Sequence, residues 1–192
     1  MNTEDLKIIG TTGMPGSGKT IFAEIAKEFG YTVVIMGDVV RRKVGEAGKE
    51  PTPENCREMM FKLREIHGDT AIAYITFEEI EKIMEEGIKK IVIDGIRSQA
   101  EVIYFREKIG KKFHIVAIHV DPELRFDRLK KRGREDLPQN EEEFMKRDQS
   151  ELKLGVAETI VYANSVIPNN EDKELFKEKC IKLLTKLGED KK

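Results

Sequence analysis

The sequence has few of the residues that build metal or redox centres. Its two cysteines, Cys56 and Cys180, are isolated and form no C-x-x-C pair. Its three histidines, His67, His114 and His119, lie far apart without the spacing of metal ligands. We therefore expect these five side chains to be ordinary core or surface residues.

The chain also lacks a charge excess and a long apolar run. Its 34 basic and 36 acidic residues give a net charge of −2, so the broad basic surface that usually binds nucleic acid is not expected. No apolar run approaches the roughly 18 residues of a membrane-spanning helix, and the first residues, Met-Asn-Thr-Glu-Asp, lack the basic start of a secretory signal. These absences predict a cytoplasmic protein that binds neither membranes nor nucleic acids, although a local arginine cluster could still hold a small polyanion.

What the sequence does contain is a phosphate-binding loop. The segment from Gly13 to Thr20, Gly-Met-Pro-Gly-Ser-Gly-Lys-Thr, fits the pattern G-x-x-x-x-G-K-[ST]. The apolar stretch Leu6 to Ile9 precedes it, and apolar residues at helical spacing follow it, so strand, loop and helix occur in the required order. The pattern predicts a bound nucleoside triphosphate.

Each part of this loop has an expected role. Backbone N–H groups of such loops converge on phosphate oxygens, and the helix N-terminus adds partial positive charge. Lys19 would reach the β- and γ-phosphates, while Thr20 would hold Mg²⁺ through its hydroxyl. The remaining residues that we expect to line the phosphates are Gly13, Met14, Pro15, Gly16, Ser17 and Gly18.

Strands and helices alternate after the loop. Apolar runs predict strands at Tyr31–Met36, Lys89–Ile93, Phe113–Val120 and Ser165–Ile167. The alternation predicts an α/β fold, with a parallel sheet between helices on both faces, in a single domain over residues 1–192. Two helices, at about 53–67 and 70–86, are more than a simple crossover needs, so we interpret residues 42–88 as an insertion that binds a phosphate acceptor.

Helix starts are marked by capping residues. Thr52 is placed as an N-cap, Ser98 and Glu101 form a capping box, and Asn140 precedes a run of glutamates. Gly155 interrupts the helix that Asn140 begins. These signals predict helices that start near residues 53, 99 and 141.

Charged side chains follow the second and third strands, at the edge where open α/β sheets bind ligands. Asp94 ends the third strand, where P-loop proteins hold Mg²⁺ directly or through water, and Arg97 would project from the same edge. Asp38 and Arg41 occupy the equivalent edge after the second strand. Arg41 could grip an acceptor phosphate, while Asp38 could either accept a proton from an attacking hydroxyl or orient Arg41.

A run of arginines supplies further candidates. Arg128 and Arg132 lie one turn apart on one side of a helix, so both could reach one triphosphate when a flexible segment closes. Arg134 could act with them or belong to a solvated face. Arg147, beside Asp148, is either a phosphate clamp or half of a surface ion pair. We interpret the segment at about 128–140 as a short lid.

In order, the phosphate loop, Gly37–Arg41, Asp94–Arg97 and Arg128–Arg132 resemble the landmarks of the adenylate kinase and nucleoside monophosphate kinase family. The chain is also similar to dephospho-CoA kinase and, most closely, to a family of archaeal P-loop proteins related to those kinases. The resemblance implies a five-stranded parallel sheet of order 2-3-1-4-5. It also implies ATP and Mg²⁺ as cofactors and a small-molecule phosphate acceptor as the partner.

The same resemblance implies roles for single residues. Arg41 would bind the acceptor phosphate, Arg128 would lie by the adenine, and Arg132 would contact the transferring phosphoryl group. Asn169, in the loop after the fifth strand, would flank the adenine. The chain departs from adenylate kinases in the arginine that follows Asp94, which comes three residues on and without a preceding proline, and in the shortness of its lid-like segment.

The leading hypothesis is an ATP- and Mg²⁺-dependent kinase acting on a nucleotide or nucleotide-like acceptor. An ATP-binding regulatory switch, or a slow ATPase acting through a protein partner, is the alternative. The guanine-reading motif N-K-x-D is absent, which favours adenine, and the balanced charge disfavours an ATPase directed by nucleic acid. Neither the acceptor nor the oligomeric state is predicted.

Overall fold

A five-stranded parallel sheet forms the centre of the computed structural model, which describes residues 6–110, 112–131, 138 and 140–189. The strand order is β2-β3-β1-β4-β5, and every neighbouring pair is parallel. The fold class and strand order expected from the sequence are confirmed. The strands are β1 (Lys7–Thr12), β2 (Thr32–Ile35), β3 (Lys90–Asp94), β4 (His114–His119) and β5 (Ser165–Pro168).

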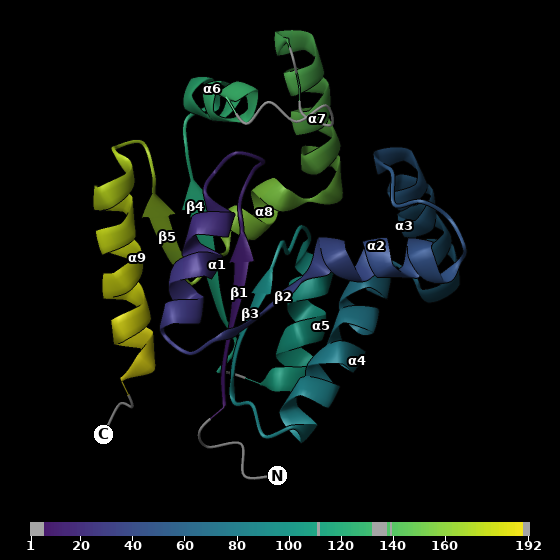
Figure 1. Cartoon of the computed structure of the whole chain (residues 1–192), viewed down its shortest axis with the longest axis horizontal. Coiled ribbons are helices and arrows are strands. Elements are labelled where there is room, and N and C mark those ends of the chain that lie inside the picture. The colour runs from purple at the N-terminus through teal and green to yellow at the C-terminus, as the bar shows by residue number, and fades with distance from the viewer. Residues whose placement is uncertain (1–5, 111, 132–137, 139, 190–192) are drawn as a thin grey trace.

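Helices cover both faces of the sheet because successive side chains of a strand point to opposite faces. Ile91 and Ile93 of β3 belong to one buried cluster, whereas Val92, between them, belongs to another. The cluster around Val92 is completed by α1 (Lys19–Glu28) and α9 (Lys173–Gly188), which lie side by side over one face (Figure 1).

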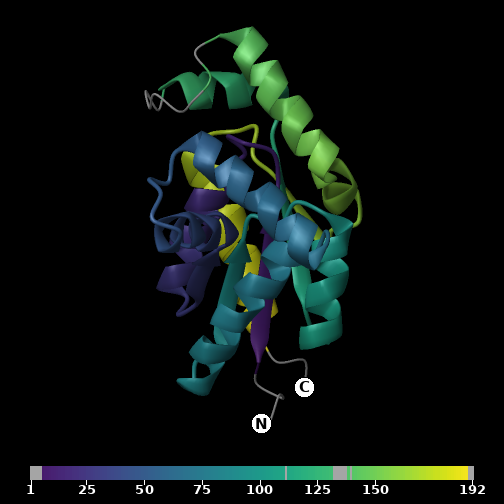
Figure 2. The ribbon, with the colours of Figure 1, turned by 90° about the vertical axis from the view of Figure 1, so that its right-hand side faces the viewer.

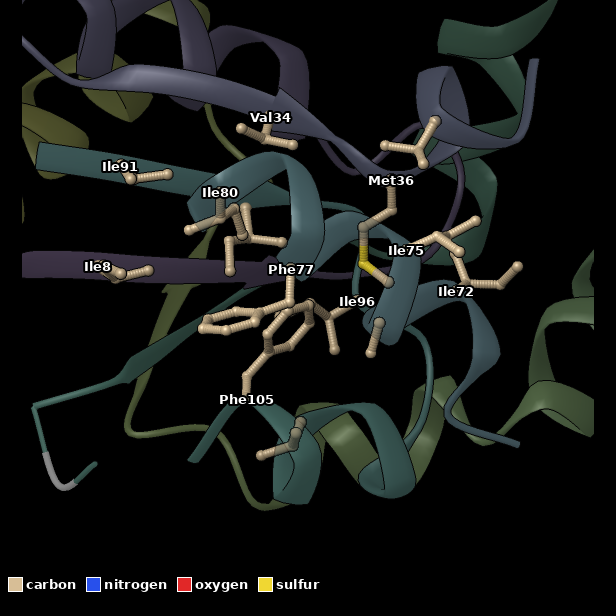
Figure 3. Close-up of a cluster of buried hydrophobic side chains, with 14 of the residues drawn as sticks. Ile8, Val34, Met36, Ile72, Ile75, Phe77, Ile80, Ile91, Ile96 and Phe105 are labelled. Carbon is tan, nitrogen blue, oxygen red and sulfur yellow. The ribbon is translucent and has the colours of Figure 1, made fainter. Parts of the chain in front are cut away.

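The opposite face is covered by α4 (Ala71–Glu85), α5 (Gln99–Ile109) and α8 (Val156–Val161). Phe77 of α4 and Phe105 of α5 point into the larger buried cluster on this side (Figure 3). The central strands are therefore buried on both faces, as their unbroken apolar sequences require.

The segment between β2 and β3 differs from the prediction. Met36 does not end a strand; it begins α2 (Met36–Glu46), and α3 (Pro53–His67) and α4 follow, so three helices lie here instead of two. The Met36 side chain is 3% exposed and points into the larger cluster near Ile75 (Figure 3). Packing on the sheet therefore decides the conformation of a residue that the apolar pattern assigned to β2.

The predicted caps are confirmed. Thr52 Oγ1 accepts a hydrogen bond from the Asn55 backbone N–H at 3.2 Å, and Ser98 and Glu101 form the expected capping box. Asn140 caps the next helix in the same way. These bonds satisfy backbone groups that the helices themselves leave unpaired.

Two helices lie beyond the carboxyl ends of the strands. They are α6 (Pro122–Lys131) and α7 (Glu141–Leu154), and both views place them above the loop that joins β1 to α1 (Figures 1 and 2). Gly155, with a φ of 100°, ends α7 and starts α8. Within the described ranges, no helix is long and apolar enough to cross a membrane.

Candidate active site

At two positions of the loop between β1 and α1, the backbone conformation accommodates only glycine well. Gly13 has a φ of 145°, and a Cβ added there would lie 2.5 Å from the Ile118 carbonyl oxygen. Gly18 has a φ of 110°, and its Cβ would lie 2.5 Å from the Asn169 side-chain nitrogen. The sequence therefore folds this segment as a tight backbone loop at the N-terminus of α1, as phosphate binding requires.

Lys19 lies over this loop. Its Nζ donates hydrogen bonds to the carbonyl oxygens of Gly13 at 2.7 Å and Met14 at 3.3 Å. Thr20 follows in the first turn of α1 and is exposed. The cation and the hydroxyl group that the motif predicts thus both lie where the loop joins α1.

Buried hydroxyl groups also line the loop. Ser17 is 1% exposed and Thr12 is fully buried, and neither hydroxyl has a hydrogen-bond partner among the described residues. Buried polar atoms without a partner are uncommon in folded proteins and often indicate a ligand or water. Neither residue lines the cavity described below, so the fit of the loop to a triphosphate rests on its glycine backbone and on Lys19.

Asp94 is fixed at the end of β3 beside β1. Thr11, its register partner, donates a hydrogen bond from Oγ1 to Asp94 Oδ1 at 2.5 Å, and Asp94 is 8% exposed. Among the described residues, no group of three or more His, Cys, Asp or Glu side chains could hold a metal by itself. The Thr20 hydroxyl and the Asp94 carboxylate are oxygen donors, the kind of ligand that suits Mg²⁺.

A cavity of about 120 Å³ adjoins the loop. It brings Arg97, from the turn after β3, together with Lys19 and with Arg147 and Glu151 of α7. Arg97 Nε lies 3.2 Å from Glu151 Oε2. Arg147 therefore lies beside the phosphate loop. The other residues that line the cavity are Gly13, Pro15, Gly95 and Ile96.

The turn that carries Arg97 is anchored by a buried carboxylate. Glu101 is 2% exposed and accepts hydrogen bonds from the backbone N–H groups of Arg97 at 2.8 Å and Ser98 at 3.3 Å. Burial raises the pKa of Glu101 above its ordinary value, and the two N–H groups and the charge of Arg97 oppose that rise. The capping box thus also orients a candidate acceptor-binding residue.

Asp38 and Arg41 lie in the first turns of α2, at the carboxyl end of β2. Their side chains are about half exposed and form an ion pair with each other. They are not among the residues that line the cavity beside Lys19. The pair supports the interpretation in which Asp38 orients Arg41.

Arg128 and Asn169 meet on the other side of the loop. Arg128 Nη2 donates a hydrogen bond to the Asn169 carbonyl oxygen at 2.9 Å. Asn169 is 3% exposed, and its Nδ2 donates to the Ser17 carbonyl oxygen at 2.7 Å. The loop after β5 is thereby tied to the phosphate loop. Arg132 and Arg134 lie outside the described residues.

Arg125 was not among the site residues predicted from the sequence. Its side chain is 4% exposed, and it donates two hydrogen bonds to the Asp148 carboxylate of α7, at 2.8 and 2.5 Å. Its Nη1 also lies 3.4 Å from the Pro15 carbonyl oxygen. A signal was available, because Arg125 precedes the buried Leu129 by one helical turn and so shares its face.

A second cavity, of about 360 Å³, lies between β5 and α9. Residues of both elements line it, including Lys179, Lys182 and Lys186, and no residue of the phosphate loop does. Lysines beside an edge strand are a common protection against unwanted strand pairing. The smaller cavity beside Lys19 is therefore the candidate active site.

The sheet order, the phosphate loop and the carboxylate at the end of β3 define a protein with the P-loop kinase fold. A family model described as an AAA domain matches residues 12–145. A UPF0200 protein of Hyperthermus butylicus is 41% identical over 94% of each chain. A UPF0200 protein of Thermococcus onnurineus is 42% identical over 94% of this chain and 97% of its own.

The chain therefore belongs to the UPF0200 family, within the larger family described as AAA domain. The predicted resemblance to an archaeal P-loop family is confirmed.

Solved structures share the fold. TT1252 from Thermus thermophilus superposes with a TM-score of 0.66 at 18% identity, covering 94% of this chain and 97% of its own. A gluconokinase from Sinorhizobium meliloti gives a TM-score of 0.60 at 17% identity, covering 96% and 94%. Dephospho-CoA kinase from Campylobacter jejuni gives 0.58 at 16% identity, covering 94% and 96%. At these identities the likeness establishes the fold alone.

Proposed function

We propose that this protein is an ATP- and Mg²⁺-dependent phosphotransferase that acts on a nucleotide or nucleotide-like small molecule. The observation that carries the proposal is the cavity in which Lys19 of the phosphate loop meets Arg97 and Arg147. One face of such a cavity can hold the γ-phosphate, while the arginines neutralise charge on the acceptor or the transferring group. The kinases that share the fold support the same class of reaction.

In the proposed mechanism the chain mainly positions the reactants and neutralises their charge. A Mg²⁺ ion held at Thr20 and Asp94 would supply positive charge that offsets the negative charge of the phosphates. Lys19 would leave the Gly13 and Met14 carbonyl oxygens for the β- and γ-phosphates, and Thr20 and Asp94 would hold the metal. Closure of the cavity around the bound reactants would exclude water from the transferring group.

The acceptor side is assigned to the edge formed by β2 and β3. Arg41 would bind the acceptor phosphate when it leaves Asp38, and Arg97 would do so when it leaves Glu151. An arginine that already has a carboxylate partner is oriented for a second anion of similar geometry. Residues 42–88 would then form the acceptor-binding insertion.

The nucleotide base is assigned to the opposite side of the loop. Arg128 and Asn169, which lie together there, would flank the adenine. Arg132 would contact the transferring phosphoryl group, and the segment at about 128–140 would act as a short lid.

The experiment that tests the function is an acceptor screen with γ-labelled ATP and Mg²⁺. Nucleoside monophosphates, nucleosides and dephospho-CoA would each be incubated with the protein, beside a reaction without acceptor. We expect label on one acceptor, and no label with Lys19→Ala, which controls for contaminating kinases. Label released only as inorganic phosphate, or not at all, would contradict the proposal and favour a regulatory switch.

A further inference from the structure

Arg125 connects three parts of the molecule that are separate in the sequence. It belongs to α6, its guanidinium binds Asp148 of α7 through two hydrogen bonds, and its Nη1 reaches the Pro15 carbonyl oxygen of the phosphate loop. The guanidinium carbon also lies 5.0 Å from the ring centroid of Phe144 on α7. A planar fork with two bonds to one carboxylate fixes orientation as well as distance.

The backbone of α6 also touches the loop. A Cβ added at Gly16 would lie 3.0 Å from the Arg125 carbonyl oxygen and 3.2 Å from Leu129 Cγ. The glycine therefore lets α6 approach the loop closely. Arg125 is consequently held from both ends, by its backbone against Gly16 and by its side chain against Asp148 and Pro15.

The neighbours of Asp148 on α7 enter the candidate active site. Arg147 directly precedes it, and Glu151 follows it by almost one helical turn; both line the cavity beside Lys19. The position of α7 therefore decides whether these two side chains reach the cavity. A shift of about 1 Å at a reacting centre can cost a hundredfold in rate.

We propose that Arg125 and Asp148 are positioning residues that hold α7 against the phosphate loop, so that Arg147 and Glu151 reach the acceptor side of the cavity. The inference rests on the function proposed above. Buried ion pairs contribute little net stability compared with apolar residues of similar size, so geometric fixation is the better explanation of this one.

The first test replaces the carboxylate and keeps its shape. Asp148→Asn should lower kcat/KM for the acceptor by about tenfold to a hundredfold, and should change the affinity for Mg-ATP by less than about twofold. Glu142→Gln is the matched control, because Glu142 pairs with Lys146 on the same helix but both side chains are largely exposed. That control should retain full activity.

A second variant separates positioning from stability. Arg125→Met combined with Asp148→Leu removes both charges and fills the space, so the melting temperature should stay close to that of the wild type. Activity should still fall as in Asp148→Asn, because two apolar side chains do not fix the orientation and distance of α7 as the two hydrogen bonds do. Full activity in this stable variant would overturn the inference.

Coupling to Arg147 gives a further readout. If Asp148 acts by placing Arg147, then Asp148→Asn should cost little in an Arg147→Ala background, and the two effects should not multiply. Independent, multiplicative losses would contradict the positioning role.

A measurement without catalysis keeps the inference separate from the proposed function. Hydrogen exchange of the α7 amides should speed up in Asp148→Asn, relative to the wild type and Glu142→Gln, while the amides of β1 and β3 should not change. If the wild type transferred phosphate to no acceptor, the proposed function would fail, yet this exchange pattern would still show that the pair holds α7. Unchanged exchange in α7 would overturn the inference.

Discussion

Single residues in the phosphate loop are constrained by space as strictly as by charge. Gly18 adopts a φ of 110°, and a methyl group there would meet Asn169 Nδ2 at 2.5 Å and Phe176 Cε1 at 3.2 Å. The Asn169 amide is itself committed to the Ser17 carbonyl oxygen. The side chain that would have to move is therefore the one that joins the loop after β5 to the phosphate site.

Gly18→Ala should accordingly lower the affinity for Mg-ATP by at least tenfold and reduce the free energy of unfolding by about 1–3 kcal/mol. Gly48→Ala is the matched control, because Gly48 also has a positive φ, 73°, but nothing lies within 4 Å of its added Cβ. The control should cost about 1–2 kcal/mol of backbone strain and leave the affinity unchanged. Calorimetric titration would measure the affinity for Mg-ATP, and denaturant unfolding would measure the free energy of unfolding. Equal affinities in the two variants would show that the contact between Gly18 and Asn169 does not affect nucleotide binding.

The sequence predicted the residues of the loop but not the role of Arg125. The motif G-x-x-x-x-G-K-[ST] of the loop predicts phosphate binding directly, because backbone conformation and charge are local properties. Arg125 lies in a run of basic residues whose usual explanation is a solvated face. Its spacing from Leu129 puts it on the buried face of α6, but its contacts with Asp148 and Phe144 depend on how another helix packs, and no local pattern contains that information.

At the scale of secondary structure, a titratable side chain joins the edge strand of the sheet to its neighbour. His114 begins β4, and its Nε2 lies 2.9 Å from the Ser165 hydroxyl of β5, the edge strand. Burial and the charge of Lys186 on α9 lower the pKa of His114 below its ordinary value of 6.5. Below that pH the unfolded chain binds a proton more readily than the folded protein.

The contribution of His114 to the free energy of unfolding should therefore be fully present above about pH 6.5. It should decrease as the pH drops below that value, by at most about 1.4 kcal/mol per pH unit. His114→Gln keeps a hydrogen-bonding group but does not titrate, so its free energy of unfolding should lose this component of the pH dependence. Urea unfolding of both proteins between pH 5 and pH 8 would measure the difference. Parallel pH profiles would show that His114 does not contribute.

The elements themselves were largely predictable, and the exception has a physical cause. Helices with strong caps, such as the one that begins after Ser98, appeared where their local hydrogen bonds placed them. The start of α2 was missed because Met36 continues an apolar run that also suits a strand. Its side chain is buried against α4, and that long-range contact decides the outcome.

At the scale of the whole molecule, the candidate site is assembled from distant parts of the chain. Lys19 comes from the phosphate loop, Arg97 from the turn after β3, and Arg147 and Glu151 from α7. The strand order was predictable from the resemblance, and with it the edge where ligands bind. The contribution of α7 was not, since it depends on how that helix packs beyond the sheet (Figure 2).

Binding at such an assembled site should stabilise the entire fold by mass action. A ligand at a hundred times its Kd adds about 2.7 kcal/mol to the free energy of unfolding. For a chain of this size that corresponds to a rise of about 5–10 °C in the melting temperature. Mg-ATP should produce this rise in the wild-type protein.

Lys19→Ala should abolish the rise and leave the ligand-free melting temperature nearly unchanged, because the Lys19 ammonium donates hydrogen bonds to the carbonyl oxygens of Gly13 and Met14 within its own loop. Lys27→Ala, which removes an exposed lysine at the far end of the same helix, should keep the full rise. Differential scanning calorimetry with and without Mg-ATP would test all three proteins. A rise that survives in Lys19→Ala but not in Lys27→Ala would place the nucleotide elsewhere, and the assignment of the phosphate loop would then be wrong.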